Sequence, residues 1–569
     1  MSDEILTLLG DEAVALGAIH AGLSAAYGYP GTPSTEIMEF LQDFKEASFI
    51  AKWCVNEKTA MEAALGTSFA GKRALVTMKH VGLNVASDPF INAALLGING
   101  GLVIAVADDP GMHSSQGEQD SRFYAFFAMI PCLEPRNQQE AYELCGEAFD
   151  LSERFHVPVM LRLTTRLSHA RSAVHPQENV QDKLRSSARE VSYSKPKDTT
   201  QWMLLPAFAR RNYTALIAKQ EEFRRWSSAH PVNKLELTGK DRTFVVITSG
   251  LGGNYYEENL YDLAAVRGTV PARLHIGAYP LPEESIRKLC EEAKEVLVIE
   301  EGQSLIEERL RGILPQTVAI RGRLAGGDGK LQGIPRSGEL DPDNVRAFLG
   351  LPPQKTILDT LSAGNPAVRF AEGKIARPPQ LCQGCPHVDS YETLNRVVRE
   401  LDNADHHPTV SVTSDIGCYS LGAAPPYSAI ETIVCMGASV GMALGAADAG
   451  IPYAFAVIGD STFIHSGITA LIDAAEANTP MTLIILDNST VAMTGCQKTA
   501  FPSAKLKNLI LGTGFDPSHY LELEAKKQLV EENAAKLKQE AEYRGLSVVV
   551  FKRECLEAAR KRLKSEKNQ

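Results

Sequence analysis

Residues 454–488 read AFAVIGDSTFIHSGITALIDAAEANTPMTLIILDN and predict a strand, a loop, a helix and a second strand, in that order. Apolar side chains recur at i, i+3, i+4 and i+7 within the helix, at Ile468, Leu471, Ile472 and Ala475. Such an amphipathic helix is long enough to cross between two parallel strands. These residues therefore indicate an α/β region with a parallel sheet.

Polar pairs follow both predicted strands. Gly459 and Asp460 end the first strand, and Asp487 and Asn488 end the second. Since parallel strands finish at the same edge of a sheet, both pairs should meet where α/β proteins bind ligands. A carboxylate, an amide oxygen and a nearby backbone carbonyl suit a Mg²⁺ ion that also binds diphosphate oxygens. Either pair alone is more often turn chemistry, so the predicted metal site depends on both.

The remainder of the chain extends this pattern into several domains, because 569 residues exceed what one hydrophobic core supports. Short apolar runs predict further strands at 74–78, 101–109, 242–250, 295–302 and 546–552. We predict an α/β domain over 1–170, a connecting segment with some helix over 171–240, a smaller α/β domain over 241–320, a linker over 321–375, a third α/β domain over 376–556, and a fraying basic tail over 557–569.

Composition excludes several classes of protein. The net charge of −11 comes without a basic stripe, which argues against a nucleic-acid partner. The N-terminus lacks a secretory signal, and Asn and Gly interrupt the richest apolar stretch, 90–107, so we expect neither export nor a membrane partner. Ten scattered cysteines are too few for a disulfide scaffold. We therefore predict a cytoplasmic enzyme.

A resemblance to a known family lies in three segments: VCMGASVGMALGAA (434–447), GDSTFIHSGI (459–468) and LDNSTVAMTG (486–495). They resemble the large subunit of indolepyruvate:ferredoxin oxidoreductases, within the thiamine-diphosphate-dependent 2-oxoacid:ferredoxin oxidoreductases. The resemblance implies two thiamine-diphosphate-binding domains of parallel-sheet type, one for the pyrimidine and one for the diphosphate. A smaller domain like the transketolase C-terminal domain is implied between them.

The same resemblance assigns roles to single residues. It implies that Asp460, Asn488 and the carbonyl of Thr490 bind Mg²⁺. The other implied cofactor contacts are Gly437 at the aminopyrimidine, Thr494 near the diphosphate, and Gly459 and Ser461 beside the metal ligands.

A glutamate is also expected, since a carboxyl group must hydrogen-bond N1′ of the pyrimidine before thiamine diphosphate can react. Residues 52–90 offer Glu57 at the start of a small-residue helix, with Glu62 as the alternative. From the residues alone, Glu57 could simply complement a helix dipole. The resemblance implies that Glu57 is the activating residue. It also implies a homodimer, because in resembling enzymes the pyrimidine domain of one protomer meets the diphosphate domain of another.

Substrate contacts are predicted in two places. The loop YGYPGTPSTE (27–36) resembles the substrate-facing loop of 2-oxoacid:ferredoxin oxidoreductases, which implies that Thr32 approaches the 2-oxoacid. Lys79 and His80 directly follow a predicted strand and are further candidates for the pocket. As solvated or packed side chains they would be equally ordinary.

Four cysteines open or close predicted elements of the last domain: Cys382, Cys385, Cys418 and Cys555. A C-x-x-C pair also suits zinc or a redox pair, and single cysteines are often apolar fillers. The resemblance implies that these four hold a [4Fe–4S] cluster that takes up electrons one at a time. Cys496 is left as a non-ligand.

The implied activity is oxidative decarboxylation of aryl 2-oxoacids such as indolepyruvate, with coenzyme A as co-substrate and acyl-CoA as product. The family's C-terminal ferredoxin-like domain is not found after Cys555, so a ferredoxin or another electron-carrier subunit is an expected partner, as is a small β-type subunit. A non-oxidative thiamine-diphosphate lyase that releases an aldehyde is the first alternative. A cofactor-free subunit descended from the enzyme is the second.

Overall fold

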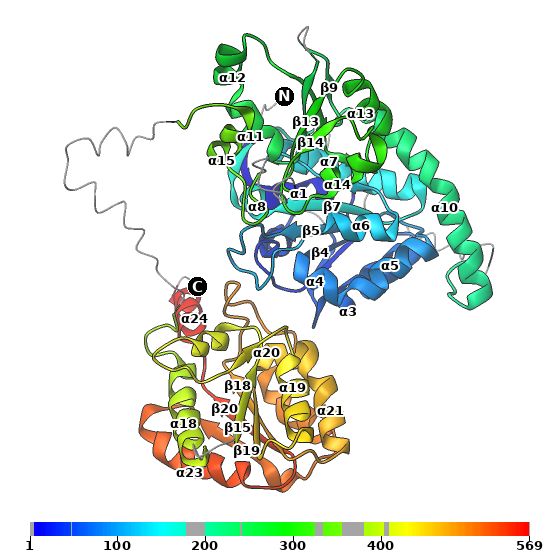
Figure 1. Cartoon of the computed structure of the whole chain (residues 1–569). Helices are drawn as coiled ribbons and strands as arrows, with labels where there is room; N and C mark the ends of the chain where they lie inside the picture. The colour runs from blue at the N-terminus through cyan, green and yellow to red at the C-terminus, as the bar shows by residue number, and fades with distance from the viewer. Residues whose placement is uncertain are drawn as a thin grey trace, which may run out of the picture. The chain divides into compact units, whose positions relative to one another are not determined.

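The computed structural model describes residues 5–46, 48–177, 198, 200–238, 242–324, 334–354, 380–402 and 409–567. The chain divides into two compact units, Met1–Gly373 and Lys374–Gln569 (Figure 1). Each unit is built on largely parallel sheets with helices packed against them, which confirms the predicted α/β class. Among the described residues, no helix combines the length and apolar character needed to cross a membrane.

A seven-stranded sheet with the order β12-β6-β7-β5-β4-β2-β3 lies at the centre of the N-terminal unit. Strand β12 runs antiparallel to its neighbour β6, whereas all other pairs are parallel. The strands are β2 (Ala25–Gly28), β3 (Ile50–Trp53), β4 (Ala74–Lys79), β5 (Leu102–Asp108), β6 (Cys132–Leu133), β7 (Val159–Thr164) and β12 (Ala278–Tyr279). A separate antiparallel pair joins β1 (Leu6–Leu9) to β8 (Arg171–Val174).

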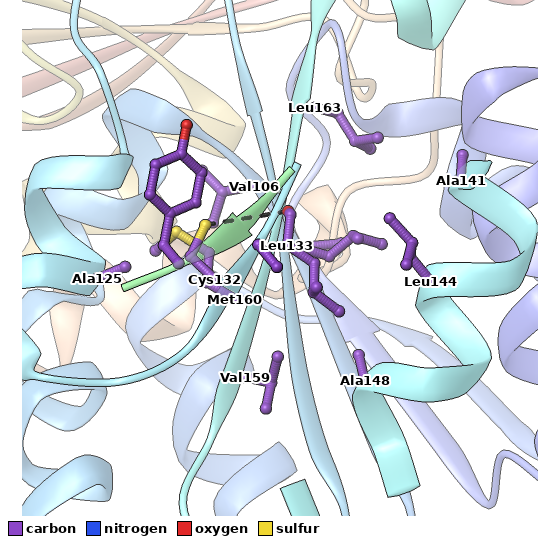
Figure 2. Close-up of a cluster of buried hydrophobic side chains, with 14 of the residues drawn as sticks. Val106, Ala125, Cys132, Leu133, Ala141, Leu144, Ala148, Val159, Met160 and Leu163 are labelled. Atoms are coloured by element: carbon purple, nitrogen blue, oxygen red, sulfur yellow. Dashed lines mark hydrogen bonds between the residues drawn. The ribbon is translucent and has the colours of Figure 1, made fainter. Parts of the chain in front are cut away.

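The central strands of this sheet are buried along their whole length. Every residue of β5, LVIAVAD, and of β7, VMLRLT, is buried. Parallel strands covered on both faces require such continuous apolar runs. Figure 2 shows Val106 of β5 and Met160 of β7 in one cluster with Leu133 of β6 and with Leu144 of helix α7 (Gln138–Phe155).

A second, five-stranded sheet in the same unit has the order β14-β13-β10-β11-β9, with β9 antiparallel. Its strands are β9 (Leu235–Glu236), β10 (Phe244–Ser249), β11 (Ala272–Ile276), β13 (Glu295–Ile299) and β14 (Ala319–Arg321). Strand β12 follows β11 in the chain, yet it pairs with β6 of the other sheet. The two sheets therefore share one hydrophobic core.

The helices of the N-terminal unit lie largely between successive strands. They are α1 (Gly10–His20), α2 (Thr35–Asp43), α3 (Glu57–Phe69), α4 (His80–Val85), α5 (Ser87–Leu96), α6 (Arg122–Ala128), α7 (Gln138–Phe155), α8 (Thr165–His169), α10 (Pro206–Ala229), α11 (Gly252–Glu258), α12 (Leu260–Arg267), α13 (Glu283–Leu289), α14 (Leu305–Ile313), α15 (Pro342–Arg346) and the 3₁₀ turn η1 (Ala347–Leu349). Helix α10 occupies part of the predicted connecting segment, of which 178–197, 199, 239 and 240 lie outside the described residues.

Buried ions also join the two sheets. Arg162 of β7 is fully buried, and its Nε lies 2.7 Å from a carboxylate oxygen of Asp108. Its guanidinium also contacts Glu134 and donates to the carbonyl of Glu301, close after β13, at 3.0 Å. Arg122 donates to the same carbonyl at 3.2 Å. Removing one partner would leave a buried charge uncompensated, so these contacts tie the two sheets together.

The C-terminal unit has one six-stranded, fully parallel sheet with the order β16-β15-β17-β18-β20-β19. Its strands are β15 (Val410–Ser414), β16 (Thr432–Ile433), β17 (Tyr453–Gly459), β18 (Met481–Asp487), β19 (Tyr520–Glu524) and β20 (Ser547–Lys552). Alternate side chains of β20 enter two cores. Val549 and Phe551 pack with helices α18 (Pro386–Leu401) and α23 (Val530–Ala541), and Val548 and Val550 pack with α19 (Ala438–Asp448) and α21 (Ile468–Glu476). Figure 1 shows these helices around the sheet.

The helices of this unit include two departures from the sequence prediction. They are α18 (Pro386–Leu401), α19 (Ala438–Asp448), α20 (Asp460–Thr462), the π-helix η3 (Phe463–Gly467), α21 (Ile468–Glu476), α22 (Leu506–Leu511), α23 (Val530–Ala541), α24 (Leu556–Lys567) and the 3₁₀ turns η2 (Cys418–Ala423), η4 (Ser503–Lys505), η5 (Pro517–His519) and η6 (Lys527–Leu529). The predicted amphipathic helix is α21, but the loop expected before it is helical. The tail expected to fray forms α24, and Lys561 Nζ donates to the carbonyl of Gly495 at 2.6 Å.

Candidate active site

Two acidic residues meet at the carboxyl edge of the six-stranded sheet. Gly459 at the end of β17 pairs with Leu486 of β18, so Asp460 and Asp487 stand at nearly the same level. The backbone N–H of Ser489 lies 3.1 Å from Asp460 Oδ2 and 3.1 Å from Asp487 Oδ1. The predicted convergence of the two strand ends is therefore present in the fold.

Asp460 is only 7% exposed. Burial raises its pKa well above the usual range, and the neighbouring carboxylate of Asp487 raises it further. A divalent cation at this position would offset both effects. Asn488 and Thr490 are buried next in the chain, and Asn488 Oδ1 accepts from the N–H of Thr490 at 3.2 Å. The donor set of a carboxylate and neutral oxygens fits Mg²⁺.

The segment 489–497 forms a short closed loop beyond these residues. Val491 bridges to Gln497, and Thr490 Oγ1 donates to the carbonyl of Gln497 at 3.0 Å. Thr494 Oγ1 donates to Gln497 Oε1 at 2.6 Å, and Gln497 Nε2 donates back to the carbonyl of Thr494 at 2.7 Å. The loop thus fixes Thr490 and Thr494 relative to the sheet edge.

Gly437 lies at a tight approach between two backbones. Its φ is +88°, and a Cβ added there would stand 2.6 Å from Cβ of Ser466 in the π-helix. Only glycine tolerates both the conformation and the contact. Ser461, half-buried in α20, lies directly after Asp460.

Asp415 was not found from the sequence. It is fully buried directly after β15, and its Oδ2 accepts from the N–H of Ser439 at 3.2 Å. Burial raises its pKa to about 6. Tyr419 donates to its other oxygen and packs against Gly459, where a Cβ would stand 2.6 Å from the ring. An aspartate directly after a strand was the only sequence signal, and it is the same signal that Asp460 gave.

His387 was also missed. It is 3% exposed in α18, and its Nε2 lies 3.3 Å from Nδ2 of Asn488. Burial lowers its pKa to about 4, so the ring is neutral near pH 7. Its ring meets that of Tyr419 edge-on at 6.3 Å between centroids.

Five cysteine thiols gather beside this site. Burial raises the pKa of Cys418 to about 12, and the neighbouring thiols Cys385, Cys555, Cys382 and Cys496 add to the shift. The backbone N–H of Cys385 donates to the carbonyl of Cys382 at 3.0 Å, which forms the C-x-x-C turn. Cys418 therefore lies within electrostatic range of the other three predicted cysteines and of Cys496, which was predicted to be a non-ligand.

These thiols do not converge on one point. In the described ranges, no three His, Cys, Asp or Glu side chains are placed to hold a single metal ion. The four cysteine thiolates that hold a [4Fe–4S] cluster would each bind a different iron, so they need not meet at one ion. All ten cysteines are described, and none forms a disulfide.

Glu57 begins helix α3 in the N-terminal unit and is 5% exposed. Its carboxylate packs on helix α4, because a Cβ added to Gly82 would stand 2.5 Å from Glu57 Oε1. Glu62, the alternative, is half exposed and forms an ion pair with Lys58. Of the two glutamates, only Glu57 is buried as an activating residue requires.

Thr32 and Lys79 lie close together at the carboxyl edge of the seven-stranded sheet. The stem of Lys79 packs on Gly31, where a Cβ would stand 3.1 Å from Lys79 Cδ. Lys79 Nζ donates to the carbonyl of Ser114 at 3.3 Å, and Ser114 Oγ donates to the carbonyl of Thr32 at 3.2 Å. The loop around Ser114 therefore connects the two predicted substrate residues.

The ammonium group of Lys79 is partly buried. Burial lowers its pKa to about 8, while the carboxylates of Asp109 and Glu57 oppose the shift. Asp109, which follows β5, was not found from the sequence. His80 is buried, and its Nε2 lies 2.8 Å from the carbonyl of Gly117. The predicted catalytic and substrate residues thus belong to the N-terminal unit, and the predicted metal and cysteine residues to the C-terminal unit.

Two known families match the chain. The family described as "Pyruvate flavodoxin/ferredoxin oxidoreductase, thiamine diP-bdg" matches residues 16–234. The family described as "Thiamine pyrophosphate enzyme, C-terminal TPP binding domain" matches residues 415–551. The chain therefore contains thiamine-diphosphate-binding domains, one in each unit.

Several relatives align over most of the chain. An indolepyruvate oxidoreductase subunit IorA from Archaeoglobus fulgidus is 39% identical over 504 residues, covering 87% of this chain and 76% of the relative. The subunit of the same name from Pyrococcus abyssi is 34% identical over 588 residues, covering 97% and 86%. The solved 2-oxoglutarate:ferredoxin oxidoreductase from Magnetococcus marinus, with 2-oxoglutarate, coenzyme A and succinyl-CoA bound, has a TM-score of 0.50 at 15% identity over 61% of this chain and 65% of that one, which shows the fold alone.

Proposed function

Since the chain belongs to the family of indolepyruvate oxidoreductase subunits IorA, we propose that it is the thiamine-diphosphate-binding subunit of an enzyme that oxidatively decarboxylates aryl 2-oxoacids such as indolepyruvate. The observation that carries the proposal is the buried Asp460 beside Asn488 and Thr490 at the sheet edge. In the proposed reaction, a 2-oxoacid, coenzyme A and two oxidised one-electron carriers give an acyl-CoA, CO₂, a proton and two reduced carriers.

Asp460, Asn488 and the carbonyl of Thr490 would hold Mg²⁺, which in turn would hold the diphosphate. Gly437 would contact the aminopyrimidine through its backbone, which its positive φ and its close packing on Ser466 hold in one conformation. Gly459, Ser461 and Thr494 would line the diphosphate. When bound, thiamine diphosphate supplies a nucleophilic carbon and an electron sink for decarboxylation.

Glu57 would hydrogen-bond N1′ of the pyrimidine and hold a proton there, and its burial supports this role. Thr32, Lys79 and His80 would face the 2-oxoacid. The ammonium group of Lys79 suits the carboxylate that every 2-oxoacid carries. We propose a homodimer in which Glu57 of one protomer serves the metal site of the other.

Cys382, Cys385, Cys418 and Cys555 would hold a [4Fe–4S] cluster, and their gathering around Cys418 supports this assignment. When bound, such a cluster would supply one-electron transfer chemistry, and a ferredoxin or another electron-carrier subunit is a proposed partner. A small β-type subunit is the other proposed partner, since the relatives are named as subunits. The ten unpaired cysteines support a reducing, cytoplasmic location.

The test starts with anaerobic purification of the full chain together with its partner subunit. Calorimetry with thiamine diphosphate and Mg²⁺ should show binding that Asp460→Ala abolishes, whereas Asp473→Ala on the exposed face of α21 should bind like the native chain. Iron and sulfide should be present at about four of each per chain. With indolepyruvate, coenzyme A and a viologen dye, the native complex should form acyl-CoA and reduce the dye.

Two results would contradict the proposal in different ways. A chain that binds no thiamine diphosphate is not the catalytic subunit. An active chain that lacks iron and releases an aldehyde without reducing the dye is a non-oxidative lyase.

A further inference from the structure

His387 links the cysteine turn to the residue proposed to bind the metal. It is the second residue of α18, two positions after Cys385, and it is 3% exposed. Its backbone N–H lies toward the Cys385 thiol, where this hydrogen bond opposes the rise in the pKa of the thiol. Its ring contacts the side chain of Asn488 on the other side, with 3.3 Å between Nε2 and Nδ2.

The direction of this side-chain hydrogen bond follows from the rest of the amide. Asn488 Oδ1 accepts from the backbone N–H of Thr490 at 3.2 Å, so the amide oxygen faces the 489–497 loop. The NH₂ group therefore faces His387 and donates to Nε2, which must carry no proton. The proton of the neutral imidazole then lies on Nδ1.

The backbone of Asn488 is also held by a hydrogen bond, from the segment that carries Cys555. The N–H of Cys555 donates to its carbonyl at 3.1 Å. Leu556, the next residue, lies by the C-x-x-C turn, because a Cβ added to Gly384 would stand 3.3 Å from Leu556 Cδ1. Asn488 is thus held at its side chain by the segment that follows Cys385 and at its backbone by Cys555, two of the three segments that carry the predicted cluster cysteines.

We propose that His387 is a positioning residue that holds the carboxamide of Asn488 with Oδ1 turned toward the metal and Nδ2 turned away from it. This inference rests on the proposed function, since it assumes Mg²⁺ at Asp460 and Asn488. Without an acceptor at position 387, the amide can rotate and present its NH₂ group to the ion. Residues that orient a metal ligand in this way typically contribute about 10- to 100-fold to metal affinity.

The test compares two substitutions of His387 in the full chain. His387→Leu keeps an apolar side chain in the space but removes the acceptor. His387→Gln can offer its Oε1 to Asn488 and should rescue the contact. Titration of Mg²⁺ into each protein at saturating thiamine diphosphate, followed by calorimetry, measures the Kd of Mg²⁺ directly and does not depend on turnover.

We expect His387→Leu to weaken Mg²⁺ binding by about 10-fold or more, and His387→Gln by less than about 3-fold. In a double-mutant cycle, His387→Leu should have little further effect once Asn488→Ala has removed the amide. An equal Kd in His387→Leu and the native chain would overturn the inference. So would a loss of the same size in the Asn488→Ala background, since that would assign His387 a purely structural role.

Failure of this inference can be told apart from failure of the proposed function. If the native chain binds no Mg²⁺ with thiamine diphosphate, the proposed function fails. If the native chain binds both and His387→Leu binds equally well, only the role of His387 fails. Should His387→Leu not fold, His387→Asn, whose shorter amide cannot span the same distance, replaces it in the comparison with His387→Gln.

Discussion

Glu57 and Glu62 lie five positions apart on one helix, and only their environment distinguishes them. Glu57 is buried against Gly82, whereas Glu62 is half exposed beside Lys58. We predict that Glu57→Gln lowers kcat by at least about 100-fold, because the amide cannot hold the proton at N1′. Steady-state assay with calorimetry as a control for cofactor binding measures this effect.

Glu62→Gln is the matched control for that substitution. It makes the same chemical change on the exposed side of α3 and should leave kcat within about 2-fold of the native value, as surface ion pairs contribute little. Equal losses in both variants would refute the assignment of Glu57.

We predict that Lys79 makes the KM for the 2-oxoacid depend on pH. Burial lowers its pKa to about 8, so its positive charge is present at pH 7 and is lost as the pH rises through about 8. If this charge binds the substrate carboxylate, KM for the 2-oxoacid should rise over that range while kcat changes less. KM measured from pH 6.5 to 9.5 tests this, with the range set by the expected titration.

Substitution of Lys79 separates its charge from its packing. Lys79→Met should raise KM at pH 7 by about 10-fold or more and remove the pH dependence. Lys79→Arg keeps a charge that does not titrate in this range, so its KM should stay flat with pH. A native KM that does not vary with pH would speak against a role for this charge.

Local sequence context was enough to propose residues at strand ends, but not residues that are defined by contacts across the fold. Asp460 and Asn488 were found because both follow predicted strands. Asp415 follows a strand too, but its partners, such as Ser439, become visible only in the fold. His387 carries no local signal at all, since its contact with Asn488 spans about 100 residues.

At the scale of single elements, the residue that precedes helix α19 is tightly constrained. Gly437 combines a φ of +88° with no space for a Cβ beside Ser466. We predict that Gly437→Ala destabilises the C-terminal unit by about 1–3 kcal/mol and weakens cofactor binding. Chemical denaturation, read out with calorimetry of thiamine diphosphate, measures both effects.

Gly445 in the same helix provides the control. It is exposed, and nothing lies within 4 Å of an added Cβ. Gly445→Ala should therefore stabilise the helix by about 0.5–1 kcal/mol, since alanine restricts the unfolded chain more than glycine does. A Gly437→Ala protein as stable as the native one would show that the backbone around Gly437 can move away from Ser466, and it would contradict this prediction.

Elements with a clear apolar period were predictable, and those shaped by their neighbours were not. The buried strands β4, β5, β10, β13 and β20 and helix α21 all match predicted segments. The π-helix η3 does not follow from the period of its residues, and its Ser466 packs on Gly437, about 30 residues away in the chain. Helix α24 was missed because its mostly charged sequence gives little apolar period, while its contact with Gly495 lies about 65 residues away.

At the scale of the whole molecule, the proposed homodimer makes a prediction of its own. If each site combines Glu57 of one protomer with Asp460 of the other, a mixed dimer of Glu57→Gln and Asp460→Ala chains holds one intact site. Random exchange of two inactive variants should then restore about a quarter of the native activity per chain. Activity measured after mixing under conditions that allow subunit exchange tests this.

Sites built within single chains would give the opposite result. Each protomer of the mixed dimer would then carry one defect in its own site, and mixing would restore nothing. Mixing each variant with itself is the control for the exchange procedure.

The crossing of β12 from one α/β region into the sheet of the other limits how the molecule can be divided. A fragment that ends anywhere before Tyr279 leaves the edge of β6 without its partner strand. Open strand edges pair readily with other chains, so such a fragment should self-associate rather than behave as an independent module. The region that matches the thiamine-diphosphate-binding family, residues 16–234, therefore cannot be transplanted alone: the smallest transferable piece extends through Tyr279.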